Sequence, residues 1–591
     1  MKTDFKYIFY TFWLLAISSC TFHEPKITVE HDGDNALVHV DGKCRYLMLP
    51  VQENSWEVRV RAVDAPAEVP MMDIRLAADS IDYYVPYELP DVSGVRTVAF
   101  EGLWPGAVCW DNIKTADEPD YANYEKFRPL YHFSPRTGWM NDPNGMVYKD
   151  GIYHLYYQHN PYGSKWGNMH WGHASSTDLV TWKHHDVALV RDTLGHIYSG
   201  SAVVDSENCS GFGKDAIVAF YTAHDGPSET QCIAYSNDGG MTYTKYEGNP
   251  VIAPHDGIRD FRDPKVFRYE EEDKWVMVLA ANYEVRFYAS TNLKDWEYTG
   301  SFGKGYGTQP SLFECPDMIR LKVDDCESVE KWMLIVNVNP GGIFGGSATQ
   351  YFIGEFDGRT FICDTPPDVS KWLDYGKDHY AAVTFSNTGD RVIAMAWMSN
   401  WQYADRVPTR QFRSANTLPR ELGLFTCGSE VYASSYPVKE VKNLRGRVME
   451  TIDAPAFESA FTIPHGSVSP VYVSLSNEIG NELLLVFDMD KGELSMDRTQ
   501  SGQLQCDQDF SVIASAPLEL CDYSDGYDVD IYVDRSSVEV FVDKGRIAMT
   551  GLVFPELPYS KLSITDGHGE SVVETHLIYE LVTENKNAQN R

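Results

Sequence analysis

Three acidic residues in the middle of the chain stand beside prolines in short, distinctive motifs. Asp142 lies in WMNDPNG, Asp263 in FRDP and Glu314 in FECPD, so a proline follows the first two directly and the third after one residue. Proline disfavours helix at the residue before it and stiffens the chain, which suits a carboxylate that must point into a cavity. Taken singly, each motif is also compatible with an ordinary turn.

Two carboxyl groups that face one glycosidic bond can hydrolyse it. One attacks the sugar or activates water, and the other protonates the departing oxygen. A third can bind sugar hydroxyls as charge develops. The sequence shows no Ser-His-Asp order, phosphate loop or dinucleotide fingerprint that would favour another chemistry. The three acids therefore favour glycoside hydrolysis, provided that the fold brings them together.

An internal repeat in the middle of the chain indicates how they could meet. Aromatic-rich apolar strands begin near residues 151, 215, 274, 331 and 391, so the repeat is about 60 residues long. A unit of this length without helical periodicity is typical of one β-propeller blade, and five copies would close a ring. The acids occupy equivalent early positions in the first, third and fourth repeats, so the ring would turn them towards a common axis. An irregular pair of β-sandwiches is the alternative.

Alternating apolar and polar runs on both sides of the repeat predict further β domains. They include ITVEH and WEVRV before it, and LLLVF and VDIYV after it. We therefore expect an all-β chain: a five-bladed β-propeller followed by a C-terminal β-sandwich and preceded by a small N-terminal β-sandwich-like domain. The expected boundaries are a signal peptide at 1–20, the N-terminal domain and a linker at 21–125, the propeller at 126–417 and the C-terminal sandwich at 418–591.

The composition limits the partners of the protein. A formal net charge of -35 would repel nucleic-acid phosphates and anionic lipid surfaces, so we expect a neutral substrate and no nucleic acid. Apart from Cys20, ten cysteines are spread singly, without a CxxC pair or Cys/His ligand spacing. This predicts no metal site and leaves disulfide pairing open.

The first twenty residues predict export. Two lysines precede an apolar stretch from residue 7 to residue 17, and two serines stand directly before Cys20. The stretch is too short for a membrane span and fits an export signal. Its end resembles a bacterial lipoprotein cleavage site, at which Cys20 would carry the lipid and tie the protein to the periplasmic side of a membrane or the cell surface. An ordinary cleaved signal with a chance cysteine is the alternative.

Together the motifs resemble those of glycoside hydrolase family 32, the β-fructosidases that include levanases, inulinases and invertases. WMNDPNG, FRDPKV and FECPD occur in the order and spacing of that family. The similarity continues through YHLYYQHNPYGSKWGNMHWGHA, YSGSAV, HYAAVTF and MAWMSNW, and resumes at DRSSVEVFV near the C-terminal end. It begins at about Tyr131, so the N-terminal domain lies outside the family core. The five-bladed propeller and trailing sandwich of the family agree with the repeat.

The resemblance implies a role for each acid. Asp142 would be the nucleophile, Glu314 the acid/base and Asp263 the transition-state partner that binds fructose hydroxyls. Arg262 would hold its neighbour Asp263 ionised. The resemblance also suggests six walls of the terminal fructose pocket: Asn141, Gln158, Trp166, Ser199, Arg262 and Trp397.

Two positions depart mildly from the family pattern. Tyr198 stands where phenylalanine is frequent, and His379 stands where an aromatic residue before the tyrosine is usual. A histidine at the pocket rim would alter linkage preference or pH response, whereas a hydrogen-bonded core histidine would do neither.

We therefore expect a retaining, exo-acting β-fructosidase. It would release fructose from levan or inulin, and from sucrose or short fructo-oligosaccharides, without a metal or organic cofactor. An endo-levanase would use the same three acids in a more open cleft. A noncatalytic fructan-binding lipoprotein would keep the aromatic walls but lose a carboxylate, and all three carboxylates are present.

Overall fold

The computed structural model describes residues 25–66, 69–121, 125–254, 257–309, 312–326, 328–573 and 576–583. Within these ranges the regular structure is almost entirely β-strand, with three short 3-10 helices: η1 (Glu270–Glu272), η2 (Lys439–Leu444) and η3 (Leu518–Leu520). None of the helices described is long and apolar enough to cross a membrane. The predicted export signal and Cys20 lie outside the described residues.

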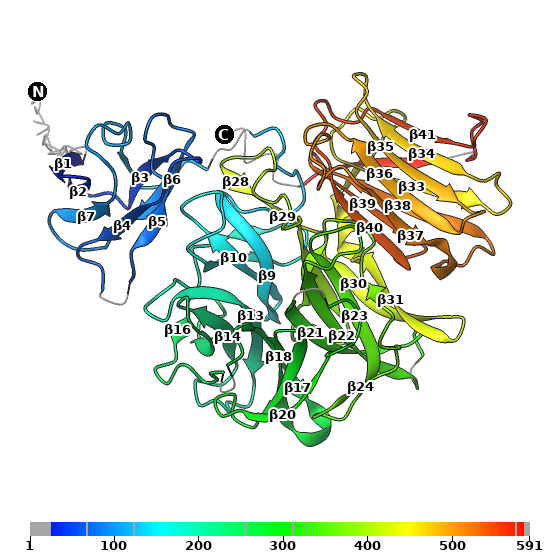
Figure 1. Ribbon diagram of the computed structural model, residues 1–591, viewed down its shortest axis with the longest axis horizontal. Helices are drawn as coiled ribbons and strands as arrows, with labels where there is room; N and C mark the ends of the chain where they lie inside the picture. Colours follow the sequence, from blue (N-terminus) through cyan, green and yellow to red (C-terminus); the bar gives the residue numbers. More distant parts are fainter. Residues whose placement is uncertain are drawn as a thin grey trace, which may run out of the picture.

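Two small sheets form the N-terminal domain, drawn in blue in Figure 1. Alternate residues of the strands face its core, as the period of two predicted: Val38, Val40, Val58 and Val60 are fully buried. One sheet contains β1 (Lys26–Asp32), β2 (Asn35–Asp41), β7 (Arg96–Glu101), β4 (Val58–Ala62) and β5 (Met72–Ile74); the other contains β6 (Tyr83–Glu88), β3 (Tyr46–Val51) and β8 (Lys114–Ala116).

Five antiparallel sheets follow and form the blades of a propeller. Blade 1 contains β9 (Gly138–Lys149), β10 (Ile152–Asn160), β11 (His170–Ser176) and β12 (Lys183–His184); blade 2 contains β13 (His196–Asp205), β14 (Ala216–His224), β15 (Glu229–Ser236) and β16 (Thr244–Lys245); blade 3 contains β17 (Phe261–Tyr269), β18 (Lys274–Ala281), β19 (Glu284–Ser290) and β20 (Glu297–Phe302). Blade 4 contains β21 (Leu312–Lys322), β22 (Glu330–Asn339), β23 (Ala348–Phe356), β24 (Phe361–Cys363) and β25 (Lys371–Trp372); blade 5 contains β26 (Tyr380–Thr384), β27 (Ile393–Met398), β29 (Ala415–Asn416), β30 (Arg420–Cys427) and β31 (Glu430–Pro437).

The blades close into a ring around one axis. Their first strands contact one another in the cyclic order β9, β13, β17, β21, β26 and back to β9. The strand β28 (Phe412–Arg413) pairs in parallel with the start of β9 and so joins the end of the propeller to its beginning. The predicted five-bladed propeller is confirmed, and the alternative of two irregular sandwiches is excluded.

The remaining chain forms the C-terminal sandwich, drawn in orange and red in Figure 1. One sheet contains β32 (Arg445–Val448), β42 (Leu577–Leu581), β33 (Phe457–Pro464), β38 (Gly526–Val533), β39 (Ser537–Val542) and β40 (Ile547–Leu552); the other contains β37 (Ile513–Pro517), β36 (Glu493–Gln500), β35 (Glu482–Asp488), β34 (Val471–Ser476) and β41 (Lys561–Thr565). Because β30 and β31 belong to blade 5, the expected boundary after residue 417 falls inside a sheet. We propose a boundary after Pro437.

A two-residue bulge recurs at the same place in the first strand of every blade. In each case two residues lie opposite one residue of the second strand; the bulged pairs are 141–142, 198–199, 263–264, 315–316 and 381–382. Bulges bend a strand and re-aim its side chains. In blades 3, 4 and 5 the first bulged residue is left-handed, with φ of 64° at Asp263, 41° at Cys315 and 53° at Ala381.

A buried ionic network joins the propeller to the C-terminal sandwich. His132 donates from both ring nitrogens, to Asp534 at 2.9 Å and to Glu539 at 2.7 Å. Arg420 pairs with Glu539 and, at 2.8 Å, with Asp374. Burial alone would lower the pKa of His132, but the hydrogen bonds to both carboxylates outweigh it and raise the pKa to about 9. The DRSSVEVFV motif therefore supplies Asp534 and Glu539 for an interdomain contact.

Candidate active site

The recurring bulges bring the three acids together around the propeller axis. Cys315, which follows Glu314, lies between the other two: its N–H donates to Asp263 Oδ2 at 2.8 Å, and its Sγ lies 3.4 Å from Asp142 Oδ2. Asp142, Asp263 and Glu314 come from blades 1, 3 and 4. The sequence prediction that a ring would gather these residues is therefore matched by the geometry.

The two oxygens of Asp142 have different surroundings. Ser199 Oγ, in the bulge of blade 2, donates to Oδ2 at 2.7 Å. Oδ1 is buried and accepts no hydrogen bond from the described protein. One oxygen thus fixes the carboxylate, while the other has no hydrogen-bond partner in the described protein.

Glu314 is contacted by a hydroxyl group and by a guanidinium group. The Tyr380 hydroxyl donates to Oε2, and Arg262 Nε lies 3.5 Å from Oε1. Burial raises the pKa of Glu314, and the charge of Asp142 adds to this, while Arg262 and the Tyr380 hydrogen bond oppose it. Glu314 therefore keeps its proton to a higher pH than an ordinary glutamate.

Asp263 is buried and its backbone is fixed, since its N–H donates to Thr222 Oγ1 at 3.0 Å. Burial raises the pKa of Asp263 to about 8; Arg262 opposes the shift, whereas the charges of Glu314 and Asp142 increase it. The expectation that Arg262 keeps this neighbour ionised is wrong for this structure, because burial outweighs the attraction. Near pH 7 the carboxyl is mostly protonated and can donate a hydrogen bond to a sugar oxygen.

Arg262 is instead fixed by other carboxylates. Its guanidinium pairs with Glu229 and, at 3.0 Å, with Asp260. Glu229 also accepts the Phe261 N–H at 2.6 Å, so the start of blade 3 is tied to the third strand of blade 2. This arrangement aims Nε at Glu314.

The remaining predicted wall residues lie at different depths. Asn141 and Gln158 are buried: Asn141 Oδ1 accepts from Trp139 Nε1 at 2.8 Å, and Gln158 Nε2 donates to Ile197 O at 3.0 Å. Trp166 lies on the loop between β10 and β11, is 41% exposed and stacks on His196 with ring centroids 5.8 Å apart. Its ring therefore lies near the surface, beside His196 and Tyr198 of blade 2.

Trp397 is fully buried beneath the acids. It packs among Trp139, Trp401 and Tyr380, with centroids 6.1, 4.8 and 6.3 Å away. Its role in the structure is that of a core residue that supports the site, and its indole N–H has no partner in the described protein.

His379 also lies in the core. It is buried, its Nδ1 lies 3.2 Å from Thr349 Oγ1, and burial lowers its pKa to about 4. Thr349 donates to Asn337 Oδ1 at 2.7 Å, and Asn337 donates to Cys315 O at 3.0 Å. His379 therefore supports the bulge after Glu314 and does not titrate near neutral pH. Tyr198 stacks on His224, with centroids 4.8 Å apart.

A buried ion pair lies beside the acids and links three blades. Lys265 Nζ lies 2.8 Å from Asp317 Oδ2 and donates to Thr384 O and Oγ1, both at 2.9 Å. The FRDPKV and FECPD motifs thus each provide one member of the acid cluster and one member of this pair.

Sequence reasoning missed three residues of the site: Tyr380, Cys315 and Glu229. Tyr380 could have been found, because it precedes the bulge of the fifth repeat just as Glu314 precedes that of the fourth. Nothing local to Glu229 indicates its contact with Arg262, which lies 33 residues further along the chain.

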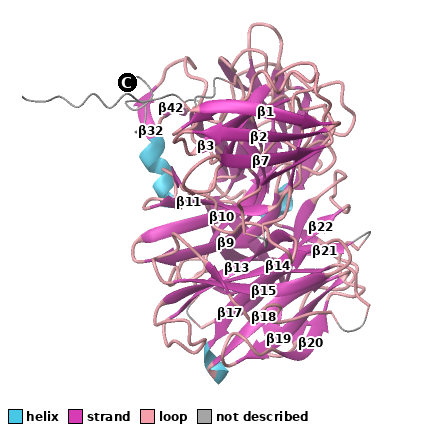
Figure 2. Ribbon diagram, turned by 90° about the vertical axis from the view of Figure 1, so that its left-hand side faces the viewer, coloured by secondary structure: helices cyan, strands magenta, loops and turns pink. Residues whose placement is uncertain are grey.

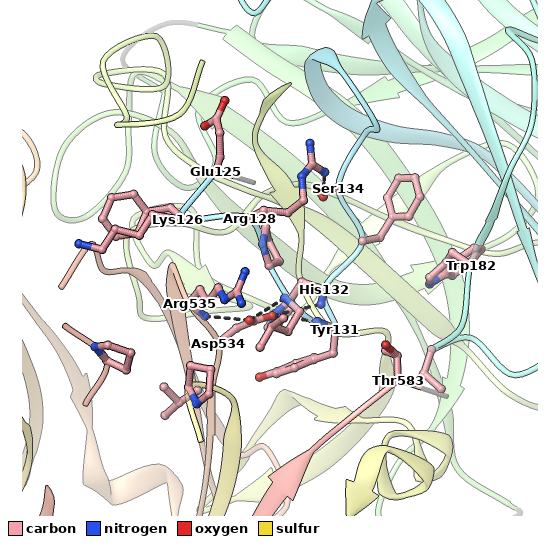
Figure 3. Close-up of a pocket in the computed structure, with 18 of the residues that line it drawn as sticks. Glu125, Lys126, Arg128, Tyr131, His132, Ser134, Trp182, Asp534, Arg535 and Thr583 are labelled. Atoms are coloured by element: carbon pink, nitrogen blue, oxygen red, sulfur yellow. Dashed lines mark hydrogen bonds and ion pairs between the residues drawn. The ribbon is translucent and has the colours of Figure 1, made fainter. Parts of the chain in front are cut away.

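A cavity of about 950 Å³ lies elsewhere, between the propeller and the C-terminal sandwich, and contains none of the three acids. Figure 3 shows Arg128, His132, Trp182 and Asp534 along its walls. Among the described residues, no group of three or more His, Cys, Asp or Glu side chains is arranged to hold a metal ion. The acid cluster is the candidate active site because of its chemistry.

Three family models match consecutive parts of the chain. The glycosyl hydrolases family 32 N-terminal domain matches residues 132–435, and the glycosyl hydrolases family 32 C-terminal domain matches residues 430–580. A domain of unknown function, DUF4980, matches residues 32–131.

Known proteins resemble most of the chain. The levanase of Bacillus subtilis is 44% identical over 492 residues, which cover 79% of this chain and 72% of that protein. The extracellular exo-inulinase of Aspergillus awamori is 37% identical over 76% of this chain and 94% of its own length. The crystal structure of exo-inulinase from the same fungus superposes with a TM-score of 0.73 at 34% identity, covering 78% of this chain and all of that one.

Replacing Tyr380 with phenylalanine should raise the pKa of Glu314, because the lost hydroxyl stabilises the ionised carboxylate. A reaction that needs protonated Glu314 would then persist to higher pH. We expect the alkaline limb of kcat/KM to move up by roughly 1 pH unit, the size of one hydrogen bond to a charged group. Tyr351→Phe is the control, because this blade 4 tyrosine uses its hydroxyl to accept from Ala433 N of blade 5 and contacts none of the three acids. An unchanged or lowered limb in Tyr380→Phe would contradict the assignment.

Proposed function

The chain belongs to glycosyl hydrolase family 32, and on this basis we propose that it is a retaining, exo-acting β-fructosidase. The substrates would be levan or inulin, and also sucrose and short fructo-oligosaccharides. The similarity to a levanase and to exo-inulinases supports this substrate class. The observation that carries the proposal is the contrast between Asp142, with one free oxygen, and Glu314, whose pKa is raised by burial. Such a contrast separates a nucleophile from an acid.

In the proposed reaction Asp142 Oδ1 attacks the ketal carbon of a terminal fructosyl residue while Glu314 gives its proton to the leaving oxygen. This breaks the glycosidic bond and forms a fructosyl ester on Asp142. Glu314, now ionised, is stabilised by Tyr380 and Arg262. It then takes a proton from water, which attacks the same carbon and releases fructose, regenerating both carboxyl groups.

Asp263 would bind fructose hydroxyls beside the reacting carbon. The position of Asp263 supports this role. Its carboxyl group accepts a hydrogen bond from the Cys315 N–H, and it lies close enough to Asp142 and Glu314 for their charges to raise its pKa. Asn141, Gln158, Ser199 and Arg262 would complete the inner pocket, with Trp166 at its rim. Trp397 would act from beneath, through the rings that it packs against.

We also propose that the protein is exported and anchored by lipid at Cys20, so that the membrane contacts only the anchor. The sequence pattern before Cys20 supports the anchor, and the extracellular relatives support export.

Asp142→Ala and Glu314→Ala should each lower kcat by roughly 10^4-fold or more, because they remove a covalent and a proton-transfer role. Asp490→Ala, at an exposed hairpin turn of the sandwich, is the control. For Glu314→Ala, azide should restore turnover of a fructoside with a good leaving group and give a β-fructosyl azide. High residual activity in either folded variant would contradict the role proposed for that residue. An azide product of inverted anomeric configuration would contradict the retaining mechanism.

Exo action predicts the order in which products appear. Free fructose should be the first and dominant product from levan or inulin, because only a chain end would enter the pocket, while long chains shorten slowly. Sizing chromatography of early time points measures this. Oligosaccharides that precede fructose would instead show endo action, and would leave the roles of Asp142 and Glu314 intact.

Lipid attachment at Cys20 predicts that Cys20→Ser changes the location of the protein. The wild type should fractionate with membranes and be released by detergent, whereas the variant should be soluble or unprocessed. Immunoblots of both fractions measure this. Identical fractionation of the two proteins would contradict the anchor.

A further inference from the structure

The N-terminal domain packs against the loop that carries Trp166. Figures 1 and 2 place this domain beside blade 1, where residues 161–169 join β10 to β11. Tyr162, from this loop, packs against the apolar core of the N-terminal domain, with its ring centroid 5.8 Å from that of Tyr87. The loop is therefore shared between the propeller and the domain that precedes it.

Ser164 forms the first polar anchor of this loop. Its N–H donates to the Tyr83 hydroxyl at 3.1 Å, and its Oγ lies 3.0 Å from the same hydroxyl. Ser164 Oγ also donates to Glu53 Oε1, so the Tyr83 hydroxyl supplies the proton between the two hydroxyl groups. Tyr83 and Ser164 are both buried. The N–H and the hydroxyl of this buried serine are thus both held by two residues of the N-terminal domain.

Glu53 extends this anchor to the strand that closes the propeller ring beside blade 1. Arg413 Nη2 lies 2.9 Å from Glu53 Oε1, and the two side chains are only 3% and 14% exposed. Arg413 lies on β28, which pairs with the start of β9, the strand that carries Asp142. One carboxylate of the N-terminal domain therefore contacts both the Trp166 loop and the strand that closes the ring.

Asn168 forms the second anchor, at the other end of the loop. Its side-chain amide forms two hydrogen bonds with the backbone of Asp73, accepting from N at 3.0 Å and donating to O at 2.7 Å. Asp73 lies on β5 of the N-terminal domain. Trp166 stands two residues from Ser164 and two from Asn168, so its backbone is held on both sides while its ring stays exposed.

We propose that the N-terminal domain positions the wall of the substrate pocket, with Glu53, Tyr83 and Asp73 as positioning residues for the Trp166 loop. This inference rests on the proposed function, because it takes Trp166 to contact the terminal fructose. A short loop held at both ends loses little entropy when substrate orders it, so the domain lowers KM. It acts on binding through Trp166 and leaves the chemistry of Asp142 and Glu314 unchanged.

Tyr83→Phe tests the proposal, because it removes the hydroxyl that Ser164 contacts and keeps the buried ring. Tyr87→Phe is a matched control on the same strand: its hydroxyl accepts from Ala62 N at 2.9 Å, inside the domain. Both variants and the wild type are compared in the full chain, alone and combined with Trp166→Ala. The readouts are kcat and KM for sucrose, and amide hydrogen exchange of residues 162–168.

Tyr83→Phe should raise KM about fivefold, as expected for roughly 1 kcal/mol of lost hydrogen bonding, with kcat within about twofold. Tyr87→Phe should change neither. In the Trp166→Ala background Tyr83→Phe should give no further rise in KM, since the two act through one element. Exchange at residues 162–168 should accelerate only in Tyr83→Phe. If that variant does not fold, Ser164→Ala can replace it, because it removes the serine hydroxyl that contacts Tyr83 and Glu53. The same rise in KM and the same faster exchange are then expected.

An unchanged KM in Tyr83→Phe, or equal effects of the two tyrosine variants, would overturn the proposal. So would additive effects of Tyr83→Phe and Trp166→Ala, which would separate the anchor from the tryptophan. A wild type that hydrolyses no fructoside would contradict the proposed function instead. The exchange data then decide on the anchor alone, and unaltered exchange at residues 162–168 in Tyr83→Phe would overturn it.

Discussion

The carboxyl groups of Asp263 and Glu314 lose hydration on burial, and the charge of Asp142 beside them raises the pKa of both further. The pKa of about 8 at Asp263 shows that these effects exceed the opposing attraction of an adjacent arginine. Two contacts oppose these effects at Glu314: the positive charge of Arg262 and a hydrogen bond from the Tyr380 hydroxyl. Arg262 in turn needs Glu229 and Asp260 to hold its position. The contacts of Glu314 therefore depend on two further carboxylates that hold Arg262 in place.

The repeated bulge provides the geometry for this balance. A regular strand would point alternate side chains to the two faces of a blade, whereas two residues placed against one re-aim the side chains at that point. Every blade has such a bulge. Ser199 lies in the bulge of blade 2, and the acids and Tyr380 lie in or directly before the bulges of the other blades. Left-handed backbone at Asp263 and Cys315 is costly for residues with a side chain, and the hydrogen bonds from Cys315 N and to Thr222 hold it in place.

Much of this arrangement could be predicted from local patterns, and the rest depends on contacts that no local pattern contains. The repeat length and the proline-flanked acids predicted the blades and the cluster of Asp142, Asp263 and Glu314. The strands β30 and β31 alternate like sandwich strands, so the sequence could not show which sheet they join. The protonation of Asp263 depends on burial that its neighbour Arg262 does not reveal. The contact between Glu53 and Arg413 joins residues 360 positions apart, and its partners could be recognised only in the folded chain.

The contacts between distant parts of the chain also determine the order in which the domains can be completed during synthesis. His132 stands at the start of the propeller and meets Asp534 across 402 positions, and β9 is completed by β28 from the other end of the ring. While the chain is being made, the first blade therefore has an open inner edge until residue 413 has emerged. The His132 site stays incomplete until Asp534 and then Glu539 follow. Closing such long loops is slow, because their entropy is lost before the contacts form. The first blade synthesised is thus completed only after the strands of three further blades have been made, and the propeller ring of a nascent chain must stay open for most of its synthesis.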